Sequence, residues 1–316
     1  MGSRILKTLS RVILVAALLI PSSLFASWEK VTWDAPKSKK GKTQGGGPIG
    51  FVGKNDAYLG FGGSHLYHWN GKSLKEIKHK HTGSKKWDLR EFVVNSKKDI
   101  WAFGDNGLSL HFTGKKWTNV KNPLTGKGRR PGRLWGAGCI SPSKCWAGSR
   151  AGDLIEWNGS SWKLVSKSGE PPAEGSRVYA MGFTSAKNGW MVGESLVAKW
   201  DGKAWKKQGT EVPRIYSMHL GKDYGWLVGD GGAFFRLEGG AWKKFNVKGS
   251  FFRMRGVSCT SKSNCWAVGD AGAAFKWDGK SWTKVKLGTF ARMSRIKFAY
   301  GQGLIVGGKG LIFQWK

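Results

Sequence analysis

Hydrophobic and polar positions repeat along almost the whole chain. Each repeat begins with a large apolar residue, which we call its anchor, at the head of a short apolar run. A Gly-rich turn leads to a second apolar run, and a further turn leads to a third. Five clear copies begin at a tryptophan: Trp101, Trp146, Trp190, Trp226 and Trp266. Two weaker copies begin at Tyr58 and Leu304, and successive anchors lie 36 to 45 residues apart. With the apolar run before each anchor, this pattern predicts four antiparallel strands per repeat, as in a β-propeller blade.

The two ends of the repeat region complement each other. The seventh copy stops at Lys316, where the other copies continue through a turn into a fourth strand. Residues 27–31 (SWEKV) match residues 281–285 (SWTKV) of the sixth copy at four of five positions. We therefore predict an all-β, seven-bladed β-propeller whose N-terminal strand closes the last blade. Such closure pairs sheet edges that would otherwise invite aggregation.

Turn residues and tryptophans recur at fixed places in the repeat. Pairs such as Asn158-Gly159 and Asp201-Gly202 predict two-residue type I′ hairpins, which need positive φ at both residues. Sixteen of the 19 tryptophans fall at three repeat positions and are interpreted as packing residues. Trp135 lies outside this pattern and is a candidate lining residue of the central channel.

The first 26 residues have the pattern of a secretory signal peptide. Basic residues precede an apolar run from Val12 to Ile20, and small residues follow up to Ala26. The run is shorter than the about 20 residues that a membrane helix needs. We predict a signal peptide over 1–26, a single propeller domain over 27–316, and a periplasmic or secreted product. An uncleaved anchor is the alternative.

Four cysteines form two C-x5-C segments, each followed by tryptophan. The pairs are Cys139 with Cys145 and Cys259 with Cys265. A pair that flanks a five-residue loop between antiparallel strands can meet disulfide geometry, and an exported protein would keep it oxidised. We predict both disulfides. Zinc is the alternative interpretation, but no histidine ligands lie beside either pair.

The repeat resembles the photosystem II stability and assembly factor family of seven-bladed propellers. An Arg-led first strand is followed by G-W-x-V-G-D/E and then by D/G-G-x-x-W, most clearly in the copies that start at Arg177 and Arg214. The resemblance covers nearly all of residues 27–316 and implies an assembly scaffold without catalytic activity. Related repeats also occur in exported bacterial propellers with no photosynthetic role. The turn W-D-G-x-x-W departs from the sialidase Asp-box S-x-D-x-G-x-x-W, because it is shorter and lacks the leading Ser or Thr.

Charge and arginine spacing point to an acidic partner. The chain has 53 Lys and Arg against 20 Asp and Glu, and its formal net charge is +33. Five arginines lie 12 or 13 residues before an anchor: Arg133, Arg177, Arg214, Arg253 and Arg292. Arg90 is offset from this position by one or two residues. This position begins the innermost strand at the mouth of the central channel. Because the planar guanidinium suits carboxylate and phosphate, we predict an arginine ring that binds an acidic protein segment, an acidic glycan or an anionic envelope surface. Nearby Lys127, Arg129 and Arg130 form an accessory basic loop.

The same arginines have a structural interpretation. Pairing the first two strands of each repeat predicts four ion pairs: Arg90 with Asp105, Arg177 with Glu194, Arg214 with Asp230, and Arg253 with Asp270. It leaves Arg133 and Arg292 without acidic partners, which makes them the strongest binding candidates.

Support for catalysis is weak, because half of the acids occupy recurring turn positions. The alternative is a sialidase-like glycoside hydrolase or lyase acting on an acidic glycan, with Tyr179 and Tyr216 two residues after ring arginines. The histidines His65, His68, His79 and His81 cluster in sequence, but alternation along strands separates neighbours, so no metal site is predicted. Without a nucleotide-binding Gly motif, no cofactor is expected.

We therefore predict an exported, monomeric, non-catalytic binding or assembly scaffold. Nucleic acid is not expected as a partner, because export separates the chain from it and the aromatic residues are used in packing. A purely architectural propeller whose charge adheres to anionic surfaces is a third hypothesis.

Overall fold

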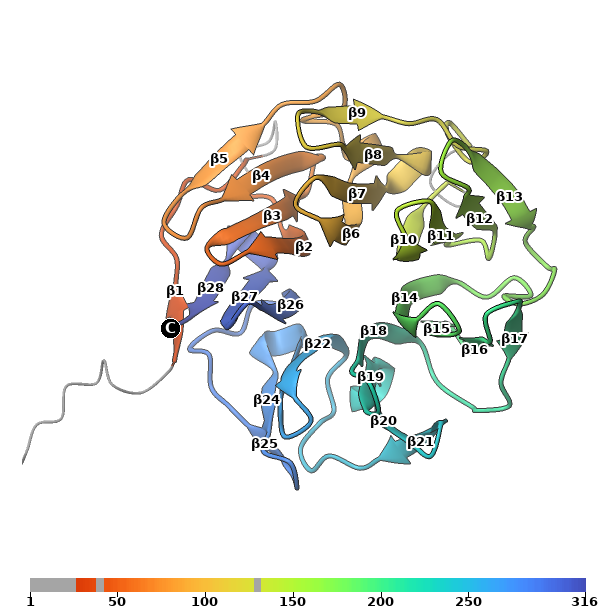
Figure 1. The fold of residues 1–316 in the computed structure, drawn as a ribbon. Helices are drawn as coiled ribbons and strands as arrows, with labels where there is room; N and C mark the ends of the chain where they lie inside the picture. Colours follow the sequence, from red (N-terminus) through yellow and green to blue (C-terminus); the bar gives the residue numbers. More distant parts are fainter. Residues whose placement is uncertain (1–26, 38–42, 128–131) are drawn as a thin grey trace, which may run out of the picture.

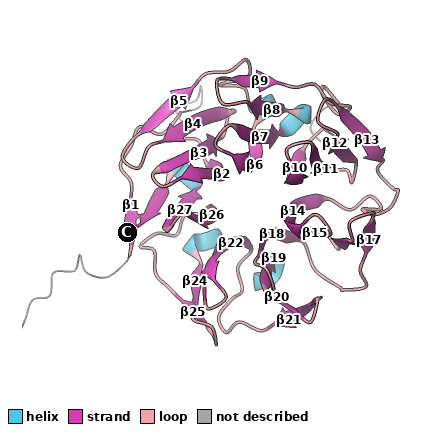
Figure 2. Ribbon diagram, in the orientation of Figure 1, coloured by secondary structure: helices cyan, strands magenta, loops and turns pink. Residues whose placement is uncertain are grey.

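The chain folds into a ring of seven four-stranded antiparallel sheets around a central opening (Figure 1). This computed structural model describes residues 27–37, 43–127 and 132–316. Within them, regular structure consists of strands and short 3-10 turns (Figure 2). The prediction of an all-β, seven-bladed β-propeller is confirmed. The predicted signal peptide, together with Arg129 and Arg130, lies outside the described residues.

Six blades are formed by consecutive strands, innermost first. Blade 1 comprises β2 (Gly46–Gly53), β3 (Asp56–Phe61), β4 (His65–Trp69) and β5 (Leu74–Ile77). Blade 2 comprises β6 (Leu89–Ser96), β7 (Asp99–Gly104), β8 (Ser109–Phe112) and β9 (Trp117–Asn119). Blade 3 comprises β10 (Leu134–Ser141), β11 (Lys144–Ser149), β12 (Leu154–Trp157) and β13 (Trp162–Ser166).

Blades 4 to 6 follow in the same order. Blade 4 comprises β14 (Val178–Ser185), β15 (Asn188–Gly193), β16 (Val197–Trp200) and β17 (Trp205–Lys207). Blade 5 comprises β18 (Ile215–Leu220), β19 (Gly225–Gly229), β20 (Phe234–Glu238) and β21 (Ala241–Phe245). Blade 6 comprises β22 (Met254–Ser261), β23 (Asn264–Gly269), β24 (Ala274–Trp277) and β25 (Trp282–Lys284). The 3-10 turns are η2 (Lys85–Trp87), η3 (Asp105–Gly107), η4 (Asp230–Gly232), η5 (Asp270–Gly272) and η6 (Gly308–Gly310).

Blade 7 joins the two ends of the repeat region. Its strands β26 (Met293–Ala299), β27 (Gln302–Gly307) and β28 (Ile312–Trp315) are completed by β1 (Trp28–Lys30). Trp28 is the Cα partner of Trp315 in the antiparallel β1–β28 pair. Figure 1 shows β1 beside β28 at the outer edge of the ring. The predicted closure by the N-terminal strand is confirmed.

Repeated tryptophans hold neighbouring blades together. Trp226 of blade 5 is buried, and its ring centroid lies 4.9 Å from that of Trp277 and 5.0 Å from that of Trp282, both in blade 6. Trp101 of blade 2 contacts Trp157 and Trp162 of blade 3 in the same way. These edge-to-face contacts confirm that the repeated tryptophans are packing residues.

The Asp-Gly and Asn-Gly turns differ from the type I′ prediction. Trp200, the last residue of β16, pairs with Trp205, the first residue of β17, so four residues form the loop between them. The Asp201 carboxylate accepts hydrogen bonds from the backbone N–H groups of Lys203 and Ala204, both at 2.9 Å. Of the pair Asp201-Gly202, only Gly202 has positive φ. The side chain of the aspartate thus stabilises the turn, and the predicted two-residue hairpin was wrong.

Both predicted disulfides are present. Cys139 pairs with Cys145 across β10 and β11, and Cys259 with Cys265 across β22 and β23; each pair is directly opposed in the strand register. They lie toward the blade ends away from the starts of the innermost strands. The part of the chain that the structure describes contains no helix long and apolar enough to cross a membrane.

Candidate binding site at the channel mouth

Each innermost strand has a shifted register near its start, at one mouth of the central channel. In six of these strands the shift leaves one residue without a Cα partner on the second strand: Arg90, Trp135, Tyr179, Tyr216, Arg255 and Ser294. β-Bulges redirect side chains at the rims of sheets. All six residues line one pocket at the mouth, so the bulges build its wall.

The residue before each innermost strand forms a second, outer ring. Its carbonyl oxygen accepts a hydrogen bond from the N–H group that follows the second strand, for example Glu194 to Arg177 at 3.0 Å and Gly308 to Arg292 at 2.7 Å. Arg133, Arg177, Arg214, Arg253 and Arg292 share this position, as their spacing predicted. Arg90 does not, because Asp88 occupies the equivalent place in blade 2 and Arg90 is the bulge residue.

Asp105 connects two blades through two arginines. Its carboxylate accepts from Arg90 Nε at 2.8 Å and lies 2.7 Å from Arg133 Nε. Both Asp105 and Arg133 are buried. The prediction that Arg133 lacks an acidic partner was therefore wrong. The partner belongs to the preceding blade, a contact that pairing within one repeat does not reveal.

A longer ion-pair chain runs across blades 4 to 6. Glu194 lies 3.2 Å from Arg177 Nε and also accepts from Arg214 Nε at 3.1 Å. Arg214 Nη1 reaches Asp230 at 3.6 Å, and Asp230 pairs with Arg253 of the next blade. The predicted pairs with Arg177 and Arg214 are thus present.

The expected pair of Arg253 with Asp270 was wrong. Arg253 reaches back to Asp230 of the preceding blade, while Asp270 is paired with Arg255, whose Nη2 donates at 3.0 Å. Arg255 belongs to the same blade as Asp270 and projects from the bulge. The bulge thus places a second arginine closer to the carboxylate than the predicted one.

Arg292 differs from the other ring arginines. It faces Gly308 rather than an acid, and among the described residues no carboxylate oxygen lies within 4.0 Å of its guanidinium. Arg292 is exposed at the mouth, but desolvation by the surrounding protein, together with Arg255 and Arg90, lowers its pKa against the opposing effect of Asp270. The buried Ser294 hydroxyl has no hydrogen-bond partner among the described residues. Both residues line the pocket, and the Arg292 side chain is the exposed one of the two.

Three aromatic residues form the opposite wall. The ring centroids of Trp135 and Tyr179 lie 4.6 Å apart, and those of Tyr179 and Tyr216 5.1 Å apart. Arginines flank this wall at both ends, with Arg133 Cζ 5.1 Å from the Trp135 centroid and Arg255 Cζ 5.4 Å from that of Tyr216. Burial raises the pKa of Tyr179. Trp135 lines the channel mouth as expected.

Further charged residues lie deeper in the channel. Glu91, Arg295 and Lys297 line a second cavity, and Arg295 also lines the pocket at the mouth. Burial raises the pKa of Glu91, against the opposing effect of the two cations, and burial lowers the pKa of Arg295. Sequence reasoning missed Arg255, Arg295 and Glu91. In the sequence, the only sign of these inner arginines was that Arg90 lies two residues after the ring position, which Asp88 occupies.

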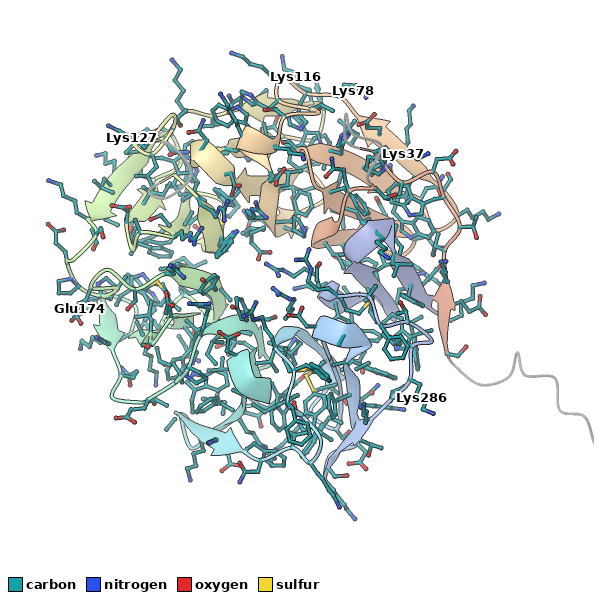
Figure 3. The ribbon with its side chains drawn as sticks, turned by 180° about the vertical axis from the view of Figure 1, so that it is seen from behind. Lys37, Lys78, Lys116, Lys127, Glu174 and Lys286 are labelled. Atoms are coloured by element: carbon teal, nitrogen blue, oxygen red, sulfur yellow. A yellow bond between two sulfur atoms is a disulfide. The ribbon has the colours of Figure 1, made fainter. Side chains whose placement is uncertain are left out.

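Two other predicted groups lie away from the mouth. Lys127 is exposed, and Figure 3 places it toward the outside of the ring. Among the four histidines, His65 contacts Glu76 at 2.6 Å and His68 contacts Asp56 at 2.7 Å. Within the described ranges, no three His, Cys, Asp or Glu residues converge as metal ligands.

Comparison with known proteins identifies the fold. No family model and no curated protein matches the chain. Among solved structures, YCF48 bound to D1 peptide is 17% identical and has a TM-score of 0.69, covering 91% of this chain and 94% of its own. YCF48 from Cyanidioschyzon merolae is 14% identical with a TM-score of 0.71, covering 92% of this chain and 99% of its own.

An enzyme shares the same architecture. A catalytically inactive virginiamycin B lyase from Staphylococcus aureus, solved with quinupristin, is 12% identical with a TM-score of 0.75, covering 92% of this chain and 99% of its own. The fold therefore occurs in both an assembly factor and a lyase, and does not by itself decide function. In fold, the chain is similar to the photosystem II assembly factor YCF48, a resemblance that its repeat motif also carries.

Proposed function

We propose that this chain is an exported, non-catalytic binding or assembly scaffold that captures an acidic protein segment at the Arg-lined channel mouth. The observation that carries the proposal is Arg292, an exposed, pocket-lining guanidinium that has no carboxylate oxygen within 4.0 Å among the described residues and is repelled by nearby Arg255 and Arg90. An incoming carboxylate would relieve that repulsion and form charge-assisted, bidentate hydrogen bonds.

The paired ring arginines have a different role in this proposal. Arg133, Arg177, Arg214 and Arg253 each share a carboxylate with a neighbour, so they hold blades in register and contribute positive potential. Direct contact with the partner falls to Arg292, with Arg255 and Arg295 beside it in the pocket.

A protein segment is favoured over a glycan as the partner. The structural neighbour YCF48 was solved with a bound peptide, which supports a peptide-binding role for a propeller of this shape. The excess of Lys and Arg over Asp and Glu would attract an acidic segment from a distance, and the attraction would weaken as salt screens it.

The test compares two charge-removing variants of residues 27–316. Arg292→Gln removes the pocket guanidinium, whereas Lys187→Gln removes an exposed charge in the hairpin between β14 and β15. Titration of a hexaglutamate peptide by calorimetry should show about tenfold or greater weakening for Arg292→Gln, as expected for a lost charge-assisted pair. Lys187→Gln should change affinity little. Equal small losses in both variants would show diffuse attraction and reject a site.

A lyase or sialidase-like activity is the second candidate. The Tyr216 hydroxyl lies 3.3 Å from Arg214 Nη1 and 3.5 Å from Asp230 Oδ2, so a tyrosine, an arginine and an acid do meet at the mouth. However, Asp230 is already engaged by Arg253 and Arg214. A carboxylate held by two guanidiniums is a poor general base, which favours the binding function.

A further inference from the structure

Exposed phenylalanines gather on two neighbouring loops of the propeller. Phe251 and Phe290 are 79% and 92% exposed, and Phe252 is also exposed. The loop 246–253 joins blades 5 and 6, and the loop 285–292 joins blades 6 and 7. Phe251 and Phe290 hold equivalent positions, each two residues before a ring arginine. Both therefore stand on the face that carries the channel mouth.

Hydrogen bonds and close packing hold these two loops against the blades. Ser250 Oγ donates to the Gly232 carbonyl at 3.2 Å, and Gly272 N–H donates to the Ala291 carbonyl at 3.0 Å. A Cβ on Gly272 would lie 1.8 Å from the Thr289 carbonyl oxygen, so the second loop packs directly onto η5. The phenyl rings thus project from supported loops.

The surroundings of the phenylalanines are basic. The two loops carry Lys248, Arg253, Lys286 and Arg292 and contain no acidic residue. Lys30 and Lys309 line a shallow depression together with Phe290, and both are exposed. Figure 3 shows Lys286 at the outer edge of this sector.

We propose that this sector docks peripherally on an anionic lipid surface, with Phe251 and Phe290 entering the interface and the lysines contacting the headgroups. Peripheral membrane proteins bury protruding aromatic side chains in the interface, while neighbouring Lys and Arg attract the anionic lipids. The Phe290 ring is 92% exposed and borders only the shallow depression that it shares with Lys30 and Lys309. Interface hot spots in protein complexes instead occupy well-packed pockets. This inference does not rest on the proposed peptide site.

Vesicle cosedimentation of residues 27–316 tests the inference, since this segment contains all seven sheets and both closing strands. Vesicles of phosphatidylglycerol and phosphatidylcholine in equal parts are compared with phosphatidylcholine alone. Wild type should bind the anionic vesicles selectively. Loss of one inserted phenyl group should weaken partitioning about tenfold, so the double variant Phe251→Ser with Phe290→Ser should lose most of the binding.

Tyr300 offers a matched control. It is 59% exposed and lies in the hairpin between β26 and β27, on the opposite face. Its φ is 53°, a conformation that asparagine tolerates, so Tyr300→Asn removes an exposed aromatic ring without added strain. This variant should bind vesicles like wild type. Unaltered binding by the double phenylalanine variant, or no wild-type binding to anionic vesicles, would overturn the inference.

Hexaglutamate titration of the double variant separates the two proposals. Unchanged peptide affinity with lost vesicle binding supports a lipid-facing surface distinct from the pocket. Lost peptide affinity with retained vesicle binding would assign the phenylalanines to the protein partner and reject the lipid surface. Peptide binding that fails in wild type while vesicle binding persists would reject only the proposed function.

Discussion

Asp105 in blade 2 forms an ion pair with Arg133 in blade 3, with 2.7 Å between Oδ1 and Nε. The carboxylate is fully buried and also accepts hydrogen bonds from Arg90. The pair therefore joins two blades at the channel mouth, at a place where an unpaired charge would be costly.

Replacing this carboxylate should destabilise the ring. Asp105→Asn leaves two guanidiniums facing each other without their shared anion, and breaking a buried pair costs about 3 to 5 kcal/mol. Urea unfolding followed by fluorescence measures the loss. Asp278→Asn, in an exposed hairpin, is the control and should cost less than about 1 kcal/mol. A loss for Asp105→Asn no larger than for the control would contradict the structural role.

The closing strand predicts a second stability effect. The Trp28 ring contacts Trp266, Phe298 and Trp315 at centroid distances of 5.3 to 5.5 Å. Trp28→Ala should lower the free energy of unfolding by about 2 to 4 kcal/mol and expose the edge of β28 to pairing between molecules. Unfolding and light scattering would measure the two effects. Wild-type stability together with monodisperse behaviour would mean that β1 does not close the ring in solution.

His219 in β18 should make stability depend on pH. Burial lowers its pKa to about 3, and its Nδ1 accepts a 3.4 Å hydrogen bond from the Cys259 N–H group, which requires the neutral ring. The unfolded residue has a pKa of about 6.5, so between these values only the unfolded state gains the proton. The free energy of unfolding should fall with decreasing pH by up to about 1.4 kcal/mol per pH unit from this residue.

His219→Gln should reduce that pH dependence below pH 6.5. The measurement is urea unfolding at several pH values between neutrality and about pH 4. His68→Gln, on β4, the third strand of blade 1, provides the comparison. If His219→Gln and wild type show the same slope, the histidine is protonated in the folded state.

The catalytic alternative predicts turnover at the mouth. We expect residues 27–316 to release no product from sialyllactose in a coupled assay, because Asp230, which accepts a hydrogen bond from the Tyr216 hydroxyl, is shared by two arginines. Turnover by wild type that is abolished in Tyr216→Phe would establish an enzyme and replace the scaffold proposal.

The number and spacing of the repeats predicted the seven-bladed architecture from the sequence. The match between residues 27–31 and 281–285 identified the closing strand because both segments fill the same place in a blade. The matched C-x5-C spacing gave both disulfides, since Cys139 and Cys145 flank one hairpin.

Contacts between blades were less accessible. Arg133 and Arg253 pair with acids of the preceding blade, and an alignment of strands within one repeat contains no information on that distance. The bulge was also not predicted, because the alignment of repeats assumed regular pairing of the first two strands. Tyr179 and Tyr216 were noticed only as neighbours of the ring arginines, although with Trp135 they form one wall of the pocket.

The pairing of β1 with β28 sets the order in which the molecule can be completed during synthesis. Because β1 comes long before β28 in the chain, its hydrogen bonds can form only after residues 312–315 have been synthesised. Six blades can assemble from local hairpins in the meantime, while the seventh needs the longest loop closure in the chain. A nascent chain stalled before residue 312 would therefore hold an unpaired β1, which a chaperone could recognise.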